Sequence, residues 1–139
     1  FDFLAIATGL VTDPRLRPEL AALSGRIACW ADRYQAPPGQ ANPVLDAHPY
    51  LGPGFELLPR TPDDAAAVHG LFAFNYSALI NHGLSAAALS GLKVALPRLA
   101  RAVADQLFLD DRQAMVEAYL GYDQAEFVGQ WPQPTQAVA

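Results

Sequence analysis

The sequence has very little cysteine and very little lysine, and both shortages exclude classes of protein. Cys29 is the single cysteine among 139 residues, so an intrachain disulfide framework and a cysteine-based metal cage are both excluded. We expect Cys29 to be a small buried residue. Lys93 is the single lysine, and the arginines are scattered through a chain whose formal net charge is −5. This charge balance argues against nucleic acid as the main partner and excludes a polybasic patch for a membrane surface.

The sequence also lacks the patterns of common catalytic and cofactor sites. It contains no Gly-x-Ser-x-Gly elbow, no Walker loop and no Gly-x-Gly-x-x-Gly, so nucleophilic hydrolysis and independent nucleotide binding both lack their usual signature. The histidines His48, His69 and His82 share no ligand-like spacing with one another or with carboxylates. We therefore predict no catalytic residue and no metal ligand in this chain.

Long apolar runs and targeting segments are missing as well. No apolar run reaches the roughly 18–20 residues that a membrane span needs. The first residues include no initiator Met and no basic segment typical of a signal peptide. We expect a cytoplasmic protein with no membrane contact. Because Phe1 already lies inside a strand-like pattern, we also expect the chain to be part of something longer.

What is present is typical of a packed α/β domain. Hydrophobic residues make up 52% of the chain and charged residues 17%, and the length suits a single domain or a fragment of one. Apolar runs bounded by turn residues predict short strands at 3–7, 26–30, 55–58 and 71–74, the first of them resembling a buried parallel strand. Residues 35–64 hold most of the prolines and predict a long loop without regular elements, apart from the strand at 55–58.

The second half of the chain predicts helices. Apolar residues recur at helical spacing on one face of a helix about five turns long, with Ser85 as its N-cap. Pro97 lies inside this helix and should kink it. A shorter final helix is expected to begin at Asp110 or Asp111 and to end before Gly121, followed by a tail at 123–139. The apolar stripe consists of Leu89, Leu92, Leu96, Leu99, Val103 and Leu107.

Two junctions could contact a ligand. The run Asp2 to Ile6 ends in Ala7-Thr8-Gly9, and ligands of open α/β sheets bind outside the carboxyl ends of strands. The segment Asn81-His82-Gly83-Leu84-Ser85 leads into the long helix, whose free N–H groups and dipole favour an electron-rich ligand. Taken singly, the first junction is better explained as a strand that ends in an ordinary glycine turn, and the second as a capped helix with a neighbouring surface histidine.

Together, the two junctions resemble a known family. An Asp, three residues, an apolar residue and Ala-Thr-Gly, followed near the C-terminus by His-Gly-Leu-Ser on a long helix, resemble flavin-dependent monooxygenases with two dinucleotide-binding domains. The resemblance covers roughly residues 2–108 and is greatest to the branch that N-hydroxylates ornithine or lysine. That branch has an aromatic residue at Leu10, Thr at Asn81 and Asp at Ala86, and these departures leave its amine chemistry open.

The resemblance implies the C-terminal fragment of an FAD- and NAD(P)-binding Rossmann-like fold. Residues 1–34 would join the nicotinamide and flavin domains, 35–64 would be an inserted loop, and 65–122 would supply the last flavin-domain strand and helices. FAD and NAD(P)H would serve the longer protein, and this chain alone would bind neither and would not be a working enzyme. The cofactor-binding residues implied here are Ala7, Thr8, Gly9, His82, Gly83, Leu84 and Ser85.

The resemblance also implies partners. The missing N-terminal nucleotide-binding part of the same protein would cover this chain's strand edges, and without it we expect the chain to self-associate. The alternative is a free-standing α/β binding or assembly domain with no catalytic activity, in which both junctions are structural. The residues that precede Phe1 in the full reading frame distinguish these two interpretations.

Overall fold

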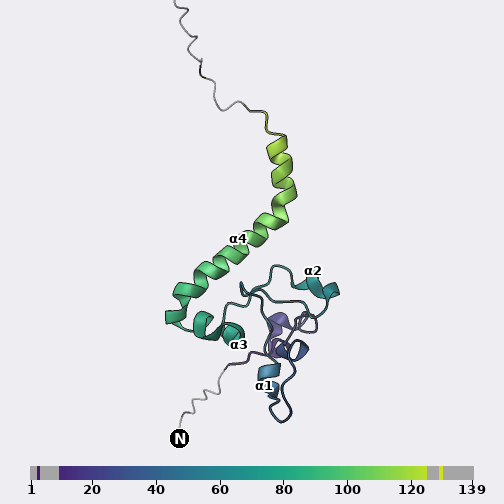
Figure 1. Ribbon diagram of the computed structural model, residues 1–139, viewed down its shortest axis with the longest axis vertical. Coiled ribbons are helices and arrows are strands. Elements are labelled where there is room, and N and C mark those ends of the chain that lie inside the picture. Colours follow the sequence, from purple (N-terminus) through teal and green to yellow (C-terminus); the bar gives the residue numbers. More distant parts are fainter. Residues whose placement is uncertain (1–2, 4–9, 125–128, 130–139) are drawn as a thin grey trace, which may run out of the picture.

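The computed structural model describes residues 3, 10–124 and 129, and the structural statements below concern this part of the chain. The predicted strand 3–7, with Ala7, Thr8 and Gly9 at its end, lies outside the described residues except for Phe3, as does most of the 123–139 tail. The described part consists of an irregular body and one long helix, α4, that extends from it (Figure 1). The α-helices are α1 (Pro43–Asp46), α2 (Ala65–Val68), α3 (Leu79–His82) and α4 (Leu89–Leu120). The 3₁₀-helices are η1 (Pro14–Leu16), η2 (Pro18–Leu20), η3 (Trp30–Asp32), η4 (Pro62–Asp64), η5 (Tyr76–Ala78) and η6 (Gly83–Ala86).

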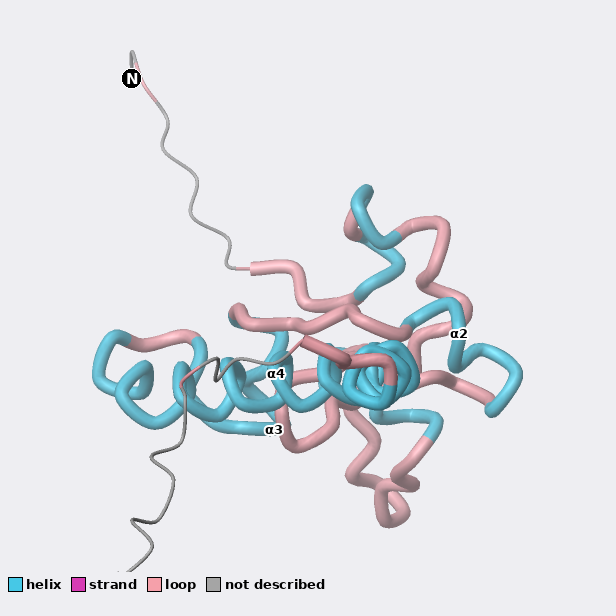
Figure 2. The backbone as a smooth tube through the Cα atoms, turned by 90° about the horizontal axis from the view of Figure 1, so that it is seen from above, coloured by secondary structure: helices cyan, strands magenta, loops and turns pink. Residues whose placement is uncertain are grey.

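The predicted strands at 26–30, 55–58 and 71–74 are short segments that pair only through isolated bridges, with Arg26 in a turn, Trp30 in η3 and Phe55 in a bend. Figure 2 shows loops in their place and no regular strand in the described part. The bridges are all antiparallel, and they join Ile27 to Pro59, Cys29 to Pro49, Leu51 to Leu57, and Glu56 to Phe72.

Proline explains why two of these four bridges do not extend into ladders. Pro49 and Pro59 each occupy a bridge, and a proline has no N–H to donate to the neighbouring strand. The remaining bonds are short, such as Ala28 N–H to the Leu58 carbonyl and Tyr50 N–H to the Ala28 carbonyl, both 2.8 Å. The short segments therefore form a set of loops that are paired by single bridges and not a regular sheet. The Rossmann-like fold stays a prediction.

The loop predicted at 35–64 contains two short helices, α1 and, at its end, the 3₁₀-helix η4. Helix α1 begins at Pro43, where the fixed φ of proline suits the first helical position. Asn42 caps it, since its Oδ1 accepts hydrogen bonds from the N–H groups of Val44 at 3.1 Å and Leu45 at 3.3 Å. The prediction of no regular element across this proline was wrong, because Asn-Pro is itself a helix start.

The core lies between the paired loops, η5 and the first half of α4. Phe55 and Ile27 are fully buried, and Val68 is 2% exposed. Ala78 of η5 and Ala95 of α4 are each 1% exposed and connect the helical segments to the same cluster. The core cluster is completed by Leu51, Leu57 and Ala73, with Leu20, Leu23, Leu71, Phe74, Ala86 and Leu99 packed against it.

Helix α4 differs from the prediction at its start and at its end. It begins at Leu89 with Ala88 as N-cap, so Ser85 does not cap it, and it continues through Asp110 and Asp111 to Leu120. The shorter final helix is therefore the second half of α4. Neither aspartate ends a helix by itself, because no glycine or proline precedes Gly121 in this stretch.

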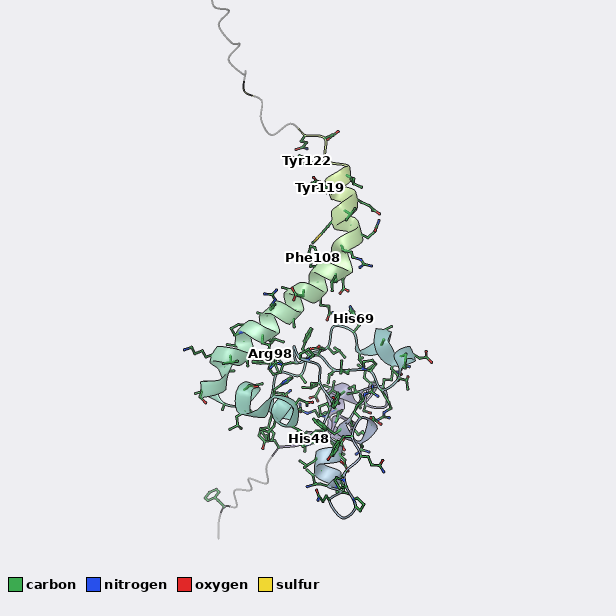
Figure 3. All side chains as sticks on the ribbon, viewed as in Figure 1. His48, His69, Arg98, Phe108, Tyr119 and Tyr122 are labelled. Carbon is green, nitrogen blue, oxygen red and sulfur yellow. The ribbon has the colours of Figure 1, made fainter. Side chains whose placement is uncertain are left out.

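Pro97 lies within α4 without ending it. Its ring removes the N–H that would bond to the Lys93 carbonyl, a loss that a helix packed on one face tolerates. Figure 3 shows the helix changing direction close to Phe108, which is beyond the predicted kink. The stripe is only partly covered: Leu92, Leu99 and Val103 are half-buried, whereas Leu89 is 89% exposed.

Within the described residues no single helix is both long enough and apolar enough to cross a membrane. The segments 76–86 and 89–120 meet those criteria only when they are joined, and they are bent by 103° relative to each other.

Candidate functional site

The predicted cofactor-facing segment is a tight double turn between α3 and α4. Helix α3 ends at His82, Gly83 reverses the chain, and η6 carries Leu84 and Ser85 toward the start of α4. Gly83 has φ +63° and ψ −152°, a conformation that is essentially restricted to glycine. The backbone at this turn therefore depends on Gly83, and the residue itself is exposed.

Asn81 fastens this turn to the body. Its side chain carbonyl accepts a hydrogen bond from the N–H of Leu51 at 3.0 Å, and its amide group donates to the carbonyl of Pro49 at 2.9 Å. The Asn81 side chain thus supplies the hydrogen bonds that a neighbouring strand would otherwise make to residues 49–51.

His82 is held by the loop that follows residue 51. Its Nε2 lies 3.0 Å from the carbonyl oxygen of Gly52, and because a carbonyl only accepts, the Nε2 atom carries the proton. Burial lowers the pKa of His82 below its ordinary value, and the positive charge of Arg98 lowers it further, against opposing effects of the Gly52 bond and Glu56. The imidazole is therefore neutral at pH 7 and serves as a hydrogen-bond donor.

The ring of Phe55 packs against the imidazole of His82. The two ring centroids are 4.5 Å apart, Phe74 packs on Phe55 edge to face at 5.0 Å, and the Arg98 guanidinium lies 5.9 Å from the Phe55 ring centre. Phe55 has φ +74°, an uncommon conformation for a bulky residue, and it is nevertheless fully buried. The packing around the ring stabilises this strained backbone.

Leu84 and Ser85 complete the turn. Leu84 is 61% exposed, whereas the Ser85 hydroxyl oxygen is buried and has no hydrogen-bond partner among the described residues. Gly91 of α4 lies directly against this turn, since a Cβ there would lie 2.7 Å from the Ser85 carbonyl oxygen. The N-terminus of the long helix, and with it the positive end of its dipole, was predicted at Ser85 but lies at Leu89. The 82–85 turn nevertheless packs against the first turn of α4.

The structure brings His82, Gly83, Leu84 and Ser85 together at one turn. It leaves their relation to Ala7, Thr8 and Gly9 a prediction, because those residues lie outside the described part. Sequence reasoning missed Phe55 and Asn81, the two residues that fix the turn. The Gly52-Pro53-Gly54 run before Phe55 was the available signal for a sharp, glycine-dependent loop.

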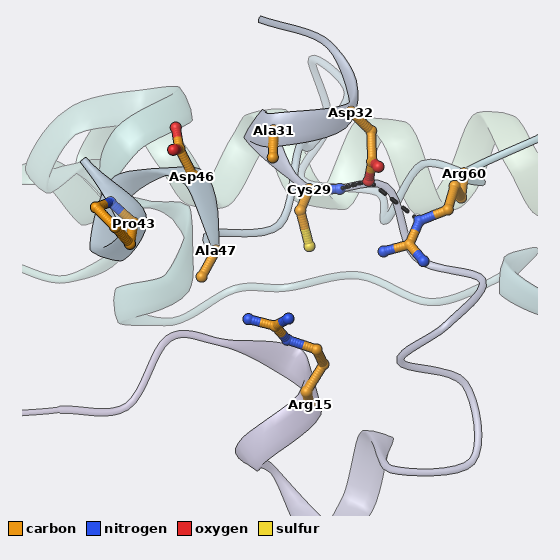
Figure 4. Close-up of a pocket in the computed structure, with 8 residues that line it drawn as sticks. All are labelled: Arg15, Cys29, Ala31, Asp32, Pro43, Asp46, Ala47 and Arg60. Atoms are coloured by element: carbon orange, nitrogen blue, oxygen red, sulfur yellow. Dashed lines mark hydrogen bonds and ion pairs between the residues drawn. The ribbon is translucent and has the colours of Figure 1, made fainter. Parts of the chain in front are cut away.

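Sequence reasoning also missed a hollow of about 410 Å³ around Cys29 (Figure 4). Asp32 Oδ2 accepts hydrogen bonds from the Cys29 N–H at 2.8 Å and from Arg60 Nε at 3.2 Å. Burial raises the pKa of the Cys29 thiol, and the charge of Asp32 raises it further. The thiol is therefore protonated at pH 7 and is not an activated nucleophile. No sequence spacing indicated this hollow.

The described residues contain no group of three or more His, Cys, Asp or Glu side chains arranged to hold a metal ion. His48 is instead a core histidine: it is 5% exposed, and its Nδ1 bonds to the Val44 carbonyl at 2.8 Å.

Comparison with known proteins gives one match of high identity. Over all 139 residues the chain is 99% identical to an FAD-dependent urate hydroxylase from Xanthomonas campestris pv. campestris, and it spans 29% of that protein's length. No family model and no solved structure matches the chain. In sequence, the chain corresponds to the C-terminal part of a flavoprotein hydroxylase.

Proposed function

We propose that this chain is the C-terminal part of an FAD-dependent hydroxylase and that its 82–85 turn faces the flavin. The observation that carries the proposal is the 99% identity to an FAD-dependent urate hydroxylase over the whole chain. The His-Gly-Leu-Ser turn independently suggested a flavoprotein monooxygenase. We extend the substrate of the relative to this chain's longer protein, which would then hydroxylate urate. The amine-hydroxylating branch finds no support in the comparison and stays a prediction.

The residues of the turn fit a flavin. Gly83 and Leu84 are exposed, the Gly83 N–H already donates to the Leu79 carbonyl, and the buried Ser85 hydroxyl has no partner among the described residues. Backbone N–H groups at the start of a helical turn are suited to an acceptor-rich ring that gains negative charge. FAD would supply the redox chemistry of the hydroxylation.

The residues of this chain would position the 82–85 turn against that cofactor and would take no part in the reaction themselves. Asn81 anchors the turn to residues 49–51, and the neutral His82 ties it to the Gly52 carbonyl. Phe55 and Arg98 close the space behind the imidazole. NAD(P)H as reductant, a Rossmann-like domain in the longer protein and a cytoplasmic location remain parts of this proposal that rest on the family resemblance.

The test compares two glycines in the full-length protein. Gly83→Ala forces an L residue into φ +63°, whereas Gly39→Ala does the same at φ +79° in an exposed loop, and neither Cβ would meet an atom within 4 Å. We expect Gly83→Ala to weaken FAD binding by about tenfold or more, and Gly39→Ala to leave it unchanged, since only the first turn faces the flavin. Flavin fluorescence titration measures both affinities, and equal affinities would refute the flavin-facing turn.

The substrate is tested with the same protein. FAD-loaded enzyme should consume urate when a reduced nicotinamide is supplied, and should not consume ornithine or lysine. Turnover of either amine in place of urate would restore the amine-hydroxylating branch. A full-length protein that binds no FAD would favour the alternative, a binding or assembly domain whose turns are structural.

A further inference from the structure

Two arginines from distant parts of the chain face the hollow around Cys29. Arg15 ends in the hollow from the side of η1, and Arg60 lines it from the segment before η4. Figure 4 shows the ends of both guanidinium groups and the Cys29 sulfur turned toward the same space. The volume of the hollow, about 410 Å³, lies within the range of small-molecule sites, about 300–1,000 Å³.

Each guanidinium is held by an aspartate that is itself fixed to the backbone. Asp13 accepts hydrogen bonds from Arg15 Nε at 2.9 Å and Nη2 at 2.7 Å, and from the Arg15 backbone N–H at 2.9 Å. Asp32 Oδ2 accepts from Arg60 Nε at 3.2 Å and from the Cys29 N–H at 2.8 Å. Both arginines are therefore oriented before a ligand arrives, which lowers the entropic cost of binding one.

The two ion pairs leave hydrogen-bond donors for a ligand. Both pairs use the Nε side of the guanidinium, so Arg15 Nη1 and both Nη atoms of Arg60 lie outside them. Guanidinium N–H groups match the two oxygens of a carboxylate in spacing and direction. Because burial raises the pKa of the Cys29 thiol, this thiol is uncharged at pH 7 and does not repel an anion.

The aspartates around the hollow limit the charge of that ligand. Asp32 and Asp46 line the hollow, and Asp13 pairs with Arg15 at its edge. Three carboxylates beside two guanidinium groups would repel a dianion such as phosphate more than a monoanion. Figure 4 shows the Asp46 carboxylate pointing away from both guanidinium groups, so their free donors stay accessible.

The hollow adjoins an apolar groove of about 290 Å³. Arg15, Pro43 and Ala47 line both spaces. The groove adds Leu16 of η1 and Val44 of α1, whose side chains are each 68% exposed. An apolar groove beside oriented guanidinium groups suits a molecule that has an apolar body and a charged end.

We propose that the hollow and the groove together bind a small organic monocarboxylate. Its carboxylate lies between Arg15 and Arg60, and its apolar part lies along Leu16 and Val44. This site is separate from the flavin-facing turn, because no residue of 82–85 lines either space. An acid of this kind uses both the free donors and the apolar surface, whereas phosphate or a neutral apolar molecule would use only one of them.

The test is isothermal titration calorimetry of the full-length, FAD-loaded protein with three probes. Benzoate has an apolar ring and one negative charge, benzyl alcohol has the same ring without the charge, and inorganic phosphate has charge without an apolar part. We expect benzoate to bind at least about tenfold more tightly than either of the others. Phosphate binding as tight as that of benzoate, or no benzoate binding up to ~10 mM, would overturn the proposal.

Three arginine variants provide a matched comparison. Arg15→Gln and Arg60→Gln each remove donors from the site, and each should weaken benzoate binding by about tenfold. The control is Arg101→Gln, since Arg101 is also paired with an aspartate, Asp105 at 3.6 Å, but lines neither space. It should leave benzoate affinity unchanged. The Arg15 side chain is 63% exposed, so its replacement should not disturb folding even if that of Arg60 does.

A fourth variant tests the apolar half of the site. Leu16→Gln replaces an exposed apolar side chain of the groove with a polar one of similar size, and it should weaken benzoate binding several-fold. Benzoate affinity that is unchanged by Leu16→Gln would overturn the assignment of the groove.

The remaining outcomes separate this proposal from the proposed function. Benzoate that changes the flavin absorbance and binds equally well to the wild type, Arg15→Gln and Arg60→Gln would lie at the flavin, which would overturn the proposal and leave the flavin assignment standing. A full-length protein that binds no FAD, but still binds benzoate through the two arginines, would refute the proposed function and support the carboxylate site.

Discussion

At the scale of single residues, the candidate site depends on side chains that form hydrogen bonds to backbone groups of a distant loop. Asn81 bonds to both a backbone N–H and a carbonyl of residues 49–51, and His82 donates to the Gly52 carbonyl. Phe55 keeps a left-handed backbone because its ring is fully buried under His82 and Phe74. These contacts join segments about thirty residues apart, and two of them lead to quantitative predictions.

The first prediction concerns Asn81. Asn81→Ala leaves the Leu51 N–H and the Pro49 carbonyl without partners, so we expect it to lower the free energy of unfolding by about 1–3 kcal/mol. Asn81→Asp keeps the acceptor for Leu51 N–H and loses only the donor to Pro49, and it should cost less than the alanine variant. Urea denaturation of the three proteins measures the order, and an aspartate variant less stable than the alanine variant would contradict it.

The second prediction concerns pH. Because the folded protein holds the pKa of His82 below its ordinary value of 6.5, the unfolded chain takes up the proton first as pH falls. The stability contributed by His82 is therefore complete above pH 6.5 and decreases as pH falls through 6.5 toward the folded pKa. His82→Gln, which keeps a donor for the Gly52 carbonyl, should show a shallower loss of stability over this range.

Thermal unfolding at a series of pH values compares the two proteins. His48 and His69 are present in both proteins, so the difference between the two curves isolates His82. Parallel curves below pH 6.5 would show that the environment of His82 does not resist protonation.

At the scale of elements, close packing of η6 against α4 fixes the candidate turn. Gly91 permits this approach, because a Cβ would lie 2.5 Å from the Ser85 Cα and 2.7 Å from its carbonyl oxygen. Glycine inside a helix normally costs stability, by about 1 kcal/mol relative to alanine. At Gly91 the lost helix propensity is therefore offset by contact with the turn.

The third prediction follows from that contact. Gly91→Ala should destabilise the protein by about 1–3 kcal/mol although alanine is the better helix former, because backbone atoms of Ser85 must move. Ser90→Ala, at the adjacent exposed helical position, is the control and should be neutral or slightly stabilising. Chemical denaturation gives both values, and a stabilised Gly91→Ala protein would mean that the turn is not packed on α4.

At the scale of the whole molecule, helix α4 leaves many of its large apolar side chains exposed. Leu89, Leu96 and Leu107 of the predicted stripe are 89%, 49% and 58% exposed, and Phe108, Leu109, Met115, Val116, Tyr119 and Leu120 are exposed as well. Surfaces of this kind normally lie against other protein. This pattern agrees with a chain that spans 29% of its near-identical relative.

The fourth prediction concerns the 139-residue chain by itself. The exposed apolar side chains of α4, from Leu89 to Leu120, should cause weak, concentration-dependent self-association at tens of micromolar, which sedimentation velocity measures. Val116→Glu with Leu120→Glu should reduce the association, and Ala114→Glu with Ala118→Glu should not. A wild-type chain that stays monomeric at these concentrations would favour the free-standing domain.

The sequence by itself determined the features that depend on near neighbours. The apolar spacing from Leu89 to Leu107 indicated a helix because helical periodicity is local. The single cysteine excluded a disulfide framework. The continuation of α4 past Asp110 was missed, since two aspartates resemble a helix start whether or not the helix has already begun.

Only the tertiary structure decided which distant segments meet. The apolar run at 26–30 indicated a strand, but its bridge partners are Pro49 and Pro59, so the run itself could not reveal that its pairing stops at single bridges. The partners of Asn81 and His82 come from the 49–55 loop, and that loop is positioned by the burial of Phe55. Such contacts depend on the folding of the whole chain, because burial and long-range hydrogen bonds have no periodicity along the sequence.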